Sequence, residues 1–140
     1  MKVIAVDFDG TLCRNKWPDI GEANELAIEQ LLERQKNGDK LILWTCREGE
    51  TLKAALMWCL ARGLRFDAVN DNLPENQEHF GNNSRKVWAN EYWDDKNVQV
   101  GMYDDLSVIT GPFQFAVMMD KRGKGPLERL KRWWKKWRCG

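Results

Sequence analysis

The sequence predicts an α/β fold whose centre is a three-layer, Rossmann-like parallel sheet. Strand-like apolar runs alternate with helical segments through the first two thirds of the chain. The first run, Val3 to Val6, is continuously apolar, which is typical of a strand buried on both faces. Several strands are followed by polar residues, as at ligand sites of open α/β sheets. We expect one α/β domain over residues 1–120 and a separate basic tail over residues 121–140.

After the first strand, the other elements are expected on hydrophobic periodicity and turn residues. They are loop 13–21, helix 22–36, strand 40–45, helix 50–62, strand 66–69, an Asn-rich loop to 83, helix 84–90 and strand 91–93. The two longer helices carry apolar residues at helical spacing: Ala23, Leu26, Ala27, Ile28, Leu31 and Leu32, then Leu52, Ala55, Leu56, Cys59 and Leu60. Gly38 and Gly63 supply their stops. Residues 98–119 fit either strands or a strand and a helix.

Composition indicates a soluble, cytoplasmic protein with an uneven charge. Residues 1–120 hold 13 Lys and Arg against 20 Asp and Glu, whereas residues 121–140 hold 9 against 1. An acidic body argues against nucleic-acid binding by the whole domain. The four cysteines are widely spaced without a C-x-x-C pair or an export signal, so reduced thiols are expected. No window approaches the roughly 18 apolar residues of a spanning helix.

Two carboxylates, a glycine and a hydroxyl follow the first strand directly, as Asp7, Asp9, Gly10 and Thr11. Neighbouring carboxylates repel each other, so a cation between them favours ionisation, and Mg²⁺ is the natural oxygen-binding candidate. Gly10 permits a sharp turn and close approach of a ligand, while Thr11 offers its hydroxyl and the following amides to an anion. The segment predicts a phosphate-transfer site, with an ordinary Asp-Gly turn as the alternative.

Polar residues also end later strands, namely Thr45 and the pair Asp94 and Asp95, with Lys86 shortly before the pair. Phosphoryl transfer through an aspartyl intermediate needs a nucleophilic carboxylate, a shielding metal ion and carboxylates that hold the ion. By strand order, the pair should face Asp7 across the crevice where the sheet reverses direction. Thr45 and Lys86 suit the binding of phosphate oxygens.

Two alternatives concern the metal ligands and the lysine. Asp104-Asp105 could also end a strand and bind the metal, in which case Asp94-Asp95 would be a solvated turn. Lys86 alone would be a solvated helix lysine, but near the start of the expected helix 84–90 it could join an anion site at a helix N-terminus.

Three further residues are candidate substrate contacts. Arg47 follows Thr45 closely enough to touch a substrate, although a surface ion pair with Glu48 or Glu50 is an equal alternative. Asn70 and Asn72 follow the third strand near the same sheet edge and could line the pocket. Turn chemistry explains both asparagines equally well.

These segments resemble, in order, the four motifs of the haloacid dehalogenase (HAD) superfamily. They are Asp7-Phe8-Asp9-Gly10-Thr11, Leu41-Ile42-Leu43-Trp44-Thr45, Lys86 and Tyr92-Trp93-Asp94-Asp95. The resemblance covers roughly residues 2–97 and is most similar to small bacterial and phage HAD-type hydrolases without a large cap. The resemblance implies that Asp7 is the nucleophile. It implies that Asp9 is the general acid and base and also gives its backbone carbonyl to Mg²⁺. Thr45 and Lys86 would bind the phosphoryl group, and Asp94 and Asp95 would complete the metal site.

An acid at position 9 favours a phosphatase over a dehalogenase, because it can protonate the leaving oxygen and then activate water. Without room for a large cap between the motifs, the site should be open. In this superfamily an open site tends to accompany larger substrates or capping by a partner subunit. The expected function is Mg²⁺-dependent hydrolysis of a phosphomonoester of undetermined identity.

Residues 126–138 predict a basic amphipathic helix outside the pattern of the superfamily. Its leucines and tryptophans recur at spacings of three and four, and lysines and arginines occupy the other sides. This composition suits peripheral binding to an anionic membrane. Nucleic-acid binding, and packing on the acidic body or on a second subunit of a homodimer, are the alternatives. A catalytically silent module that docks through this tail is the alternative function.

Overall fold

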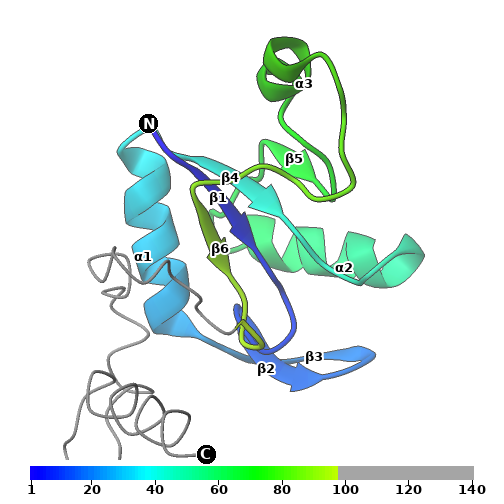
Figure 1. Ribbon diagram of the computed structural model, residues 1–140. Coiled ribbons are helices and arrows are strands. Elements are labelled where there is room, and N and C mark those ends of the chain that lie inside the picture. The colour runs from blue at the N-terminus through cyan, green and yellow to red at the C-terminus, as the bar shows by residue number, and fades with distance from the viewer. Residues whose placement is uncertain (98–140) are drawn as a thin grey trace, which may run out of the picture. The chain divides into compact units, whose positions relative to one another are not determined.

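The computed structural model describes residues 1–97 of the chain, and its centre is a four-stranded parallel sheet. The strand order is β5-β4-β1-β6, with β1 (Val3–Val6) between β4 (Lys40–Leu43) and β6 (Glu91–Trp93), and with β5 (Ala68–Val69) beside β4 (Figure 1). Val6 is paired with Leu43 on one side and with Trp93 on the other, so three strands end at one level. The α/β fold with a parallel sheet is confirmed.

Helices α1 (Glu25–Lys36) and α2 (Gly49–Leu60) contribute to one hydrophobic core with the sheet. Helix α1 begins three residues later than expected, because Asn24 caps it by accepting a hydrogen bond from the Ala27 amide at 3.3 Å. Leu26 and Leu60 were expected on the buried faces but are 59% and 57% exposed. The buried side chains of this core are Ile4, Val6, Phe8, Leu12, Cys13, Ile28, Leu31, Leu41, Leu43, Ala55, Cys59 and Leu64.

A second, smaller core contains Val3, Ala5 and Ile42 from the strands. These side chains pack with Leu73 and Val87, which come from irregular segments. They alternate along the strands with the residues of the first core, so they lie on the opposite face of the sheet. Helix α3 buries no side chain, so among residues 1–97 this face has no helical layer, and the third layer stays a prediction.

The segment expected as loop 13–21 is instead an antiparallel hairpin of β2 (Cys13–Lys16) and β3 (Asp19–Ala23). The expectation was wrong because these strands are largely polar and exposed, so no apolar alternation indicates them. At Gly21 the strands approach so closely that a Cβ atom would lie 2.0 Å from the carbonyl oxygen of Arg14. The hairpin lies beyond the carboxyl ends of β1 and β6 (Figure 1).

Helix α3 spans Pro74–Phe80, and the helix expected over residues 84–90 is absent. Proline suits the first turn of α3, and Gly81 ends the helix in the left-handed conformation with φ +67°. Residues 84–90 form bends and irregular backbone before β6. Lys86 therefore does not lie at a helix N-terminus, which excludes that version of the predicted anion site.

A charged network joins several elements at the amino end of the sheet. Arg34 of α1 donates to both carboxylate oxygens of Glu91 at 3.1 and 2.9 Å, and its Nε donates to Asp39. Asp39 also accepts from the backbone amide of Lys2 at 2.8 Å. Burial is the largest influence on the pKa of Glu91 and raises it, but hydrogen bonds from Arg34, Trp93 and Lys2 together lower the pKa to about 2.

Several predictions lie outside the described residues: the boundary at residue 120, the alternative ligand pair Asp104-Asp105 and the tail helix 126–138. The membrane, nucleic-acid and homodimer contacts of that tail therefore stay predictions. Cys13, Cys46 and Cys59 carry free thiols. Across residues 1–97, every helix is too short or too polar to cross a membrane.

Candidate active site

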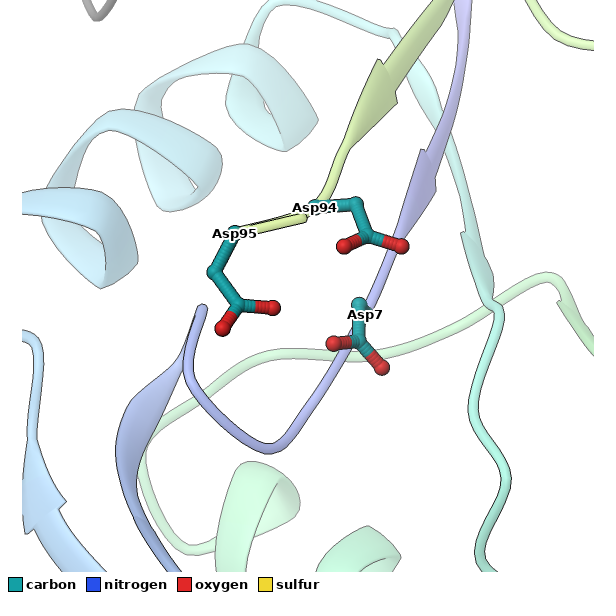
Figure 2. Close-up of side chains that lie close together, drawn as sticks. All are labelled: Asp7, Asp94 and Asp95. Carbon is teal, nitrogen blue, oxygen red and sulfur yellow. The ribbon is translucent and has the colours of Figure 1, made fainter. Parts of the chain in front are cut away.

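Three carboxylates converge where β1 and β6 end side by side. Asp7 directly follows β1, and its backbone amide donates to the carbonyl oxygen of Trp93 at 2.9 Å, which holds the two strand ends together. Asp94 and Asp95 directly follow β6, and one carboxylate oxygen from each of the three residues lies within 4.8 Å of the others. Figure 2 shows the three side chains directed into one space. This is the juxtaposition that strand order predicted, because the chain crosses from one side of β1 to the other here.

The environment of Asp7 disfavours its charge. Burial of this half-buried side chain has the largest effect and raises its pKa. A hydrogen bond from the Phe8 amide opposes this effect, while the charges of Asp94, Asp95 and Asp9 add to it, and the pKa of Asp7 lies at about 6. A cation among the carboxylates would relieve their repulsion.

The three residues fit Mg²⁺ in donor type and in size. All three offer oxygen, the donor that Mg²⁺ prefers, and ligand oxygens on opposite sides of a Mg²⁺ ion lie about 4 Å apart. Oxygens within 4.8 Å of one another need only small side-chain adjustments to reach that geometry. Asp95 is exposed, which leaves space for the water ligands that Mg²⁺ usually keeps. The Asp9 side chain is outside this cluster, and the metal-binding role of its backbone carbonyl, which the resemblance implies, stays a prediction.

Gly10 has a conformation and a position that only glycine satisfies. Its φ of +89° is unfavourable for other residues, and a Cβ atom at this position would lie 2.3 Å from Oδ2 of Asp95. Thr11 binds the same partner, because its Oγ1 accepts a hydrogen bond from the Asp95 amide at 3.1 Å. The loop after β1 and the turn after β6 are thus fitted to each other, and the predicted contact of Thr11 with phosphate stays a prediction.

The expectation that the amides after Thr11 bind an anion was wrong. The amides of Leu12 and Cys13 donate to the carbonyl oxygen of Phe8 at 2.9 and 3.4 Å, and the Thr11 amide donates to the same oxygen at 3.3 Å. These bonds form the tight turn that leads from β1 into the hairpin. Because the N–H groups are already used in the turn, they do not form an anion site.

Arg47 makes contacts different from those expected. It is only 1% exposed, and its Nε and Nη2 donate to Oδ2 and Oδ1 of Asp9, both at 2.8 Å. Nη2 also donates to the Asp19 carbonyl at 2.8 Å, and Nη1 donates to the Pro18 and Thr51 carbonyls at 3.1 and 3.4 Å. All five N–H groups of the guanidinium therefore have acceptors within the chain.

These contacts contradict the surface ion pair of Arg47 with Glu48 or Glu50, since the side chain is buried against Asp9. They also leave Arg47 no free donor for a substrate in this conformation. Residue pattern could not indicate this arrangement, because two of the acceptors are backbone carbonyls of the hairpin that was expected as a loop.

Thr45 and Asn70 lie together at the carboxyl end of the sheet. Thr45 follows β4, next to β1, and its backbone amide donates to Oδ1 of Asn70 at 2.8 Å. Its hydroxyl oxygen accepts from the Arg47 amide at 3.1 Å, and within residues 1–97 its hydroxyl hydrogen has no acceptor. Asn70, with φ +50°, therefore shapes the loop that carries Thr45. Its predicted contact with substrate stays a prediction.

Asn72 was expected to contact the substrate but is buried and serves the loop that carries Lys86. Its Oδ1 accepts from the Trp88 amide at 2.7 Å, and its Nδ2 donates to Asn83 and to the Ser84 carbonyl at 2.9 and 3.0 Å. Both of its side-chain donors are thus occupied. Lys86 is exposed, and its ammonium lies 5.3 Å from the centre of the Tyr92 ring. Within residues 1–97 it pairs with none of the four candidate carboxylates.

Comparison with known proteins gives one informative match. No family model and no curated protein matches the chain. A solved structure, described as the conserved protein coded by a locus from Bacteroides thetaiotaomicron, is 41% identical and covers 81% of this chain and 96% of its own, with a TM-score of 0.64. The two proteins belong to one family. The match to this conserved Bacteroides protein supports the α/β fold, and its description names no activity, so function is argued from the site.

Proposed function

We propose that this protein is a Mg²⁺-dependent phosphomonoester hydrolase that works through an aspartyl-phosphate intermediate. The observation that carries the proposal is the convergence of Asp7, Asp94 and Asp95 where β1 and β6 end. Asp9, two residues after Asp7, is held apart from this cluster by Arg47. The site thus offers two kinds of carboxylate, one set for a metal ion and a nucleophile and a separate one for proton transfer.

Asp7, Asp94 and Asp95 would hold the ion, together with the Asp9 backbone carbonyl that the resemblance implies. Bound Mg²⁺ would supply positive charge that offsets repulsion between the Asp7 carboxylate and the phosphate and stabilises charge in the transition state. Thr45, on the loop after β4, and Lys86, on the segment before β6, would bind phosphoryl oxygens through a hydroxyl and an ammonium group. The Lys86 side chain is exposed, and its ammonium would leave the Tyr92 ring to bind phosphate.

In the first step, a carboxylate oxygen of Asp7 attacks phosphorus in line with the leaving oxygen. The bond between phosphorus and the ester oxygen breaks, and protonated Asp9 gives its proton to that oxygen. In the second step, Asp9 takes a proton from water while the water oxygen attacks phosphorus. The bond between phosphorus and Asp7 breaks, which releases inorganic phosphate and restores both carboxyl groups.

The test is release of inorganic phosphate from nucleotides, sugar phosphates and 3'- or 5'-phosphorylated oligonucleotides, in Mg²⁺ and in chelator. We expect Mg²⁺-dependent release from at least one class and its loss in Asp7→Asn, which keeps the size of the side chain but removes the nucleophile. Glu78→Gln, at an exposed position of α3, is the matched control and should keep full activity. Release that persists in chelator or in Asp7→Asn would refute the mechanism.

A further inference from the structure

The Arg47 guanidinium is the largest charged group in the buried part of the described chain, and its contacts point to a task beyond packing. A charged group removed from water destabilises the fold unless its charge and its hydrogen bonds are satisfied. Here the Asp9 carboxylate balances the charge, and carbonyl oxygens accept the remaining N–H groups. The rings of Phe8 and Trp17 lie 4.9 and 5.1 Å from the guanidinium carbon.

From these contacts, and resting on the proposed function, we propose that Arg47 is a positioning residue that holds Asp9 for proton transfer to the leaving group. The paired hydrogen bonds from Nε and Nη2, both 2.8 Å, fix the plane and the direction of the Asp9 carboxylate. They use two of its roughly four lone-pair sites, so an oxygen can still carry the transferred proton.

The same pair keeps Asp9 out of the metal cluster. Asp9 is only two residues from Asp7, and an unrestrained carboxylate at this distance along the chain would be free to join Asp7, Asp94 and Asp95 around a cation. The Arg47 pair instead directs the Asp9 carboxylate toward the hairpin, where the Pro18 and Asp19 carbonyls accept from the same guanidinium. Arg47 thereby separates the proton-transfer group from the metal-binding groups.

This role predicts a dependence on the leaving group that a merely structural role does not. A p-nitrophenolate ion leaves without protonation, whereas an alkoxide needs the proton from Asp9. The parameter kcat/KM reports the steps up to the departure of the leaving group, so it isolates this proton transfer. A residue that only supports the fold would change kcat/KM equally for both kinds of ester.

The test measures kcat/KM of the wild-type protein and of Arg47→Lys on two esters. One ester is p-nitrophenyl phosphate, and the other is an alkyl phosphate that the wild-type protein hydrolyses. Lysine keeps the charge but lacks the paired donors. General acid catalysis contributes about 100-fold or more, so we expect a loss of at least about 100-fold on the alkyl ester and less than about 10-fold on the p-nitrophenyl ester. Asp9→Asn should show the same pattern. Arg62→Lys, at an exposed arginine that lies over Trp58, should change neither.

Equal losses on both esters would overturn the positioning role. If Arg47→Lys unfolds, Arg47→Met, which keeps an unbranched side chain between the two rings, is measured in the same way, and failure of both variants to fold would also assign Arg47 to stability alone. If the wild type releases phosphate from neither ester nor from the wider panel, the proposed function itself fails. A failure of the function is thus distinguishable from a failure of the role of Arg47.

Discussion

The two ends of the central sheet carry opposite charge arrangements. At the amino end, Arg34 pairs with Glu91 and Asp39, and each charge has a partner. At the carboxyl end, Asp7 and Asp94 lie beside Asp95, whose ion pair in the described part of the chain is with exposed Lys96 at 3.8 Å. The pKa of Glu91 is lowered to about 2, whereas that of Asp7 is raised to about 6. We infer that the paired charges at the amino end support the fold, and that the carboxylate cluster at the carboxyl end, which has only this exposed lysine as a cationic partner within residues 1–97, serves a function.

The largest effect is expected for substitution of Asp7, which should abolish activity without lowering stability. Asp7→Asn should lower kcat by about 10,000-fold or more, as loss of a nucleophile does in other enzymes that form covalent intermediates. It should leave the thermal unfolding midpoint in the absence of metal unchanged or raised, because one of the repelling carboxylates is neutralised. Phosphate release and calorimetry measure the two effects. A lowered midpoint would show that Asp7 supports the fold.

A smaller loss of activity is expected at Gly10, where the loop after β1 packs against the turn after β6. Gly10→Ala would place a Cβ atom 2.3 Å from Oδ2 of Asp95 and force a residue with a side chain to adopt φ +89°. Because a displacement of about 1 Å in an active site can cost about 100-fold in rate, we expect a loss of that order in kcat/KM. Gly38→Ala, at φ +92° with no atom within 4 Å of the added Cβ, is the control for backbone strain alone. Equal activity of the two variants would contradict the fit between Gly10 and Asp95.

Substitutions at the amino end of the sheet should show the reverse pattern, with stability lowered and activity unchanged. Arg34→Ala removes the partner of two carboxylates that are partly shielded from water, and we expect a loss of about 2 kcal/mol in the free energy of unfolding. Turnover below the unfolding transition should be unchanged. Arg62→Ala, at an exposed position, should cost less. Urea unfolding, with phosphate release measured in parallel, tests this prediction. Loss of turnover in folded Arg34→Ala would contradict the claim that charges at the amino end serve stability alone.

Low pH should reduce the free energy of unfolding by protonating Glu91 at the amino end of the sheet. The pKa of Glu91 is about 2 in the folded chain, against the ordinary value of 4.5 that applies to the unfolded chain. The contribution of Glu91 to stability is therefore fully present above pH 4.5 and is lost as the pH falls toward 2. We expect this contribution to be about 2 kcal/mol, after allowance for partial exposure. Glu91→Gln should flatten the dependence of unfolding free energy on pH between 4.5 and 2. An unchanged slope in this variant would assign the acid sensitivity to other carboxylates.

Sequence reasoning was most successful where local pattern and chain topology agree. The apolar run Val3 to Val6 indicated β1, and the polar residues after it and after β6 indicated a shared sheet edge. Parallel strands bring their carboxyl ends to one edge, so Asp7, Asp94 and Asp95 could be placed together without knowledge of side-chain packing. The element bounds were less accurate, because capping by Asn24 decided where α1 begins.

Sequence reasoning failed where tertiary contacts decide the structure. The hairpin strands are polar, so their pairing leaves no hydrophobic period, and the burial of Arg47 depends on Phe8 and Trp17, which are distant in sequence. Asn72 looked like a loop residue near a pocket but is buried by the segment around Trp88. Trp17 and Trp88, which provide these contacts, both come from segments whose conformation was itself mispredicted.

The central claim is that Asp7 becomes phosphorylated, and trapping of that intermediate tests it most directly. The protein is mixed with Mg²⁺ and with a phosphomonoester that it hydrolyses, and the reaction is quenched with borohydride. Borohydride reduces an acyl phosphate to an alcohol. Peptide mass spectrometry then locates the modified residue. The account predicts reduction at Asp7 that requires both Mg²⁺ and substrate, with Asp9, Asp94 and Asp95 unmodified. Turnover without modification at Asp7, or modification at another carboxylate, would contradict it.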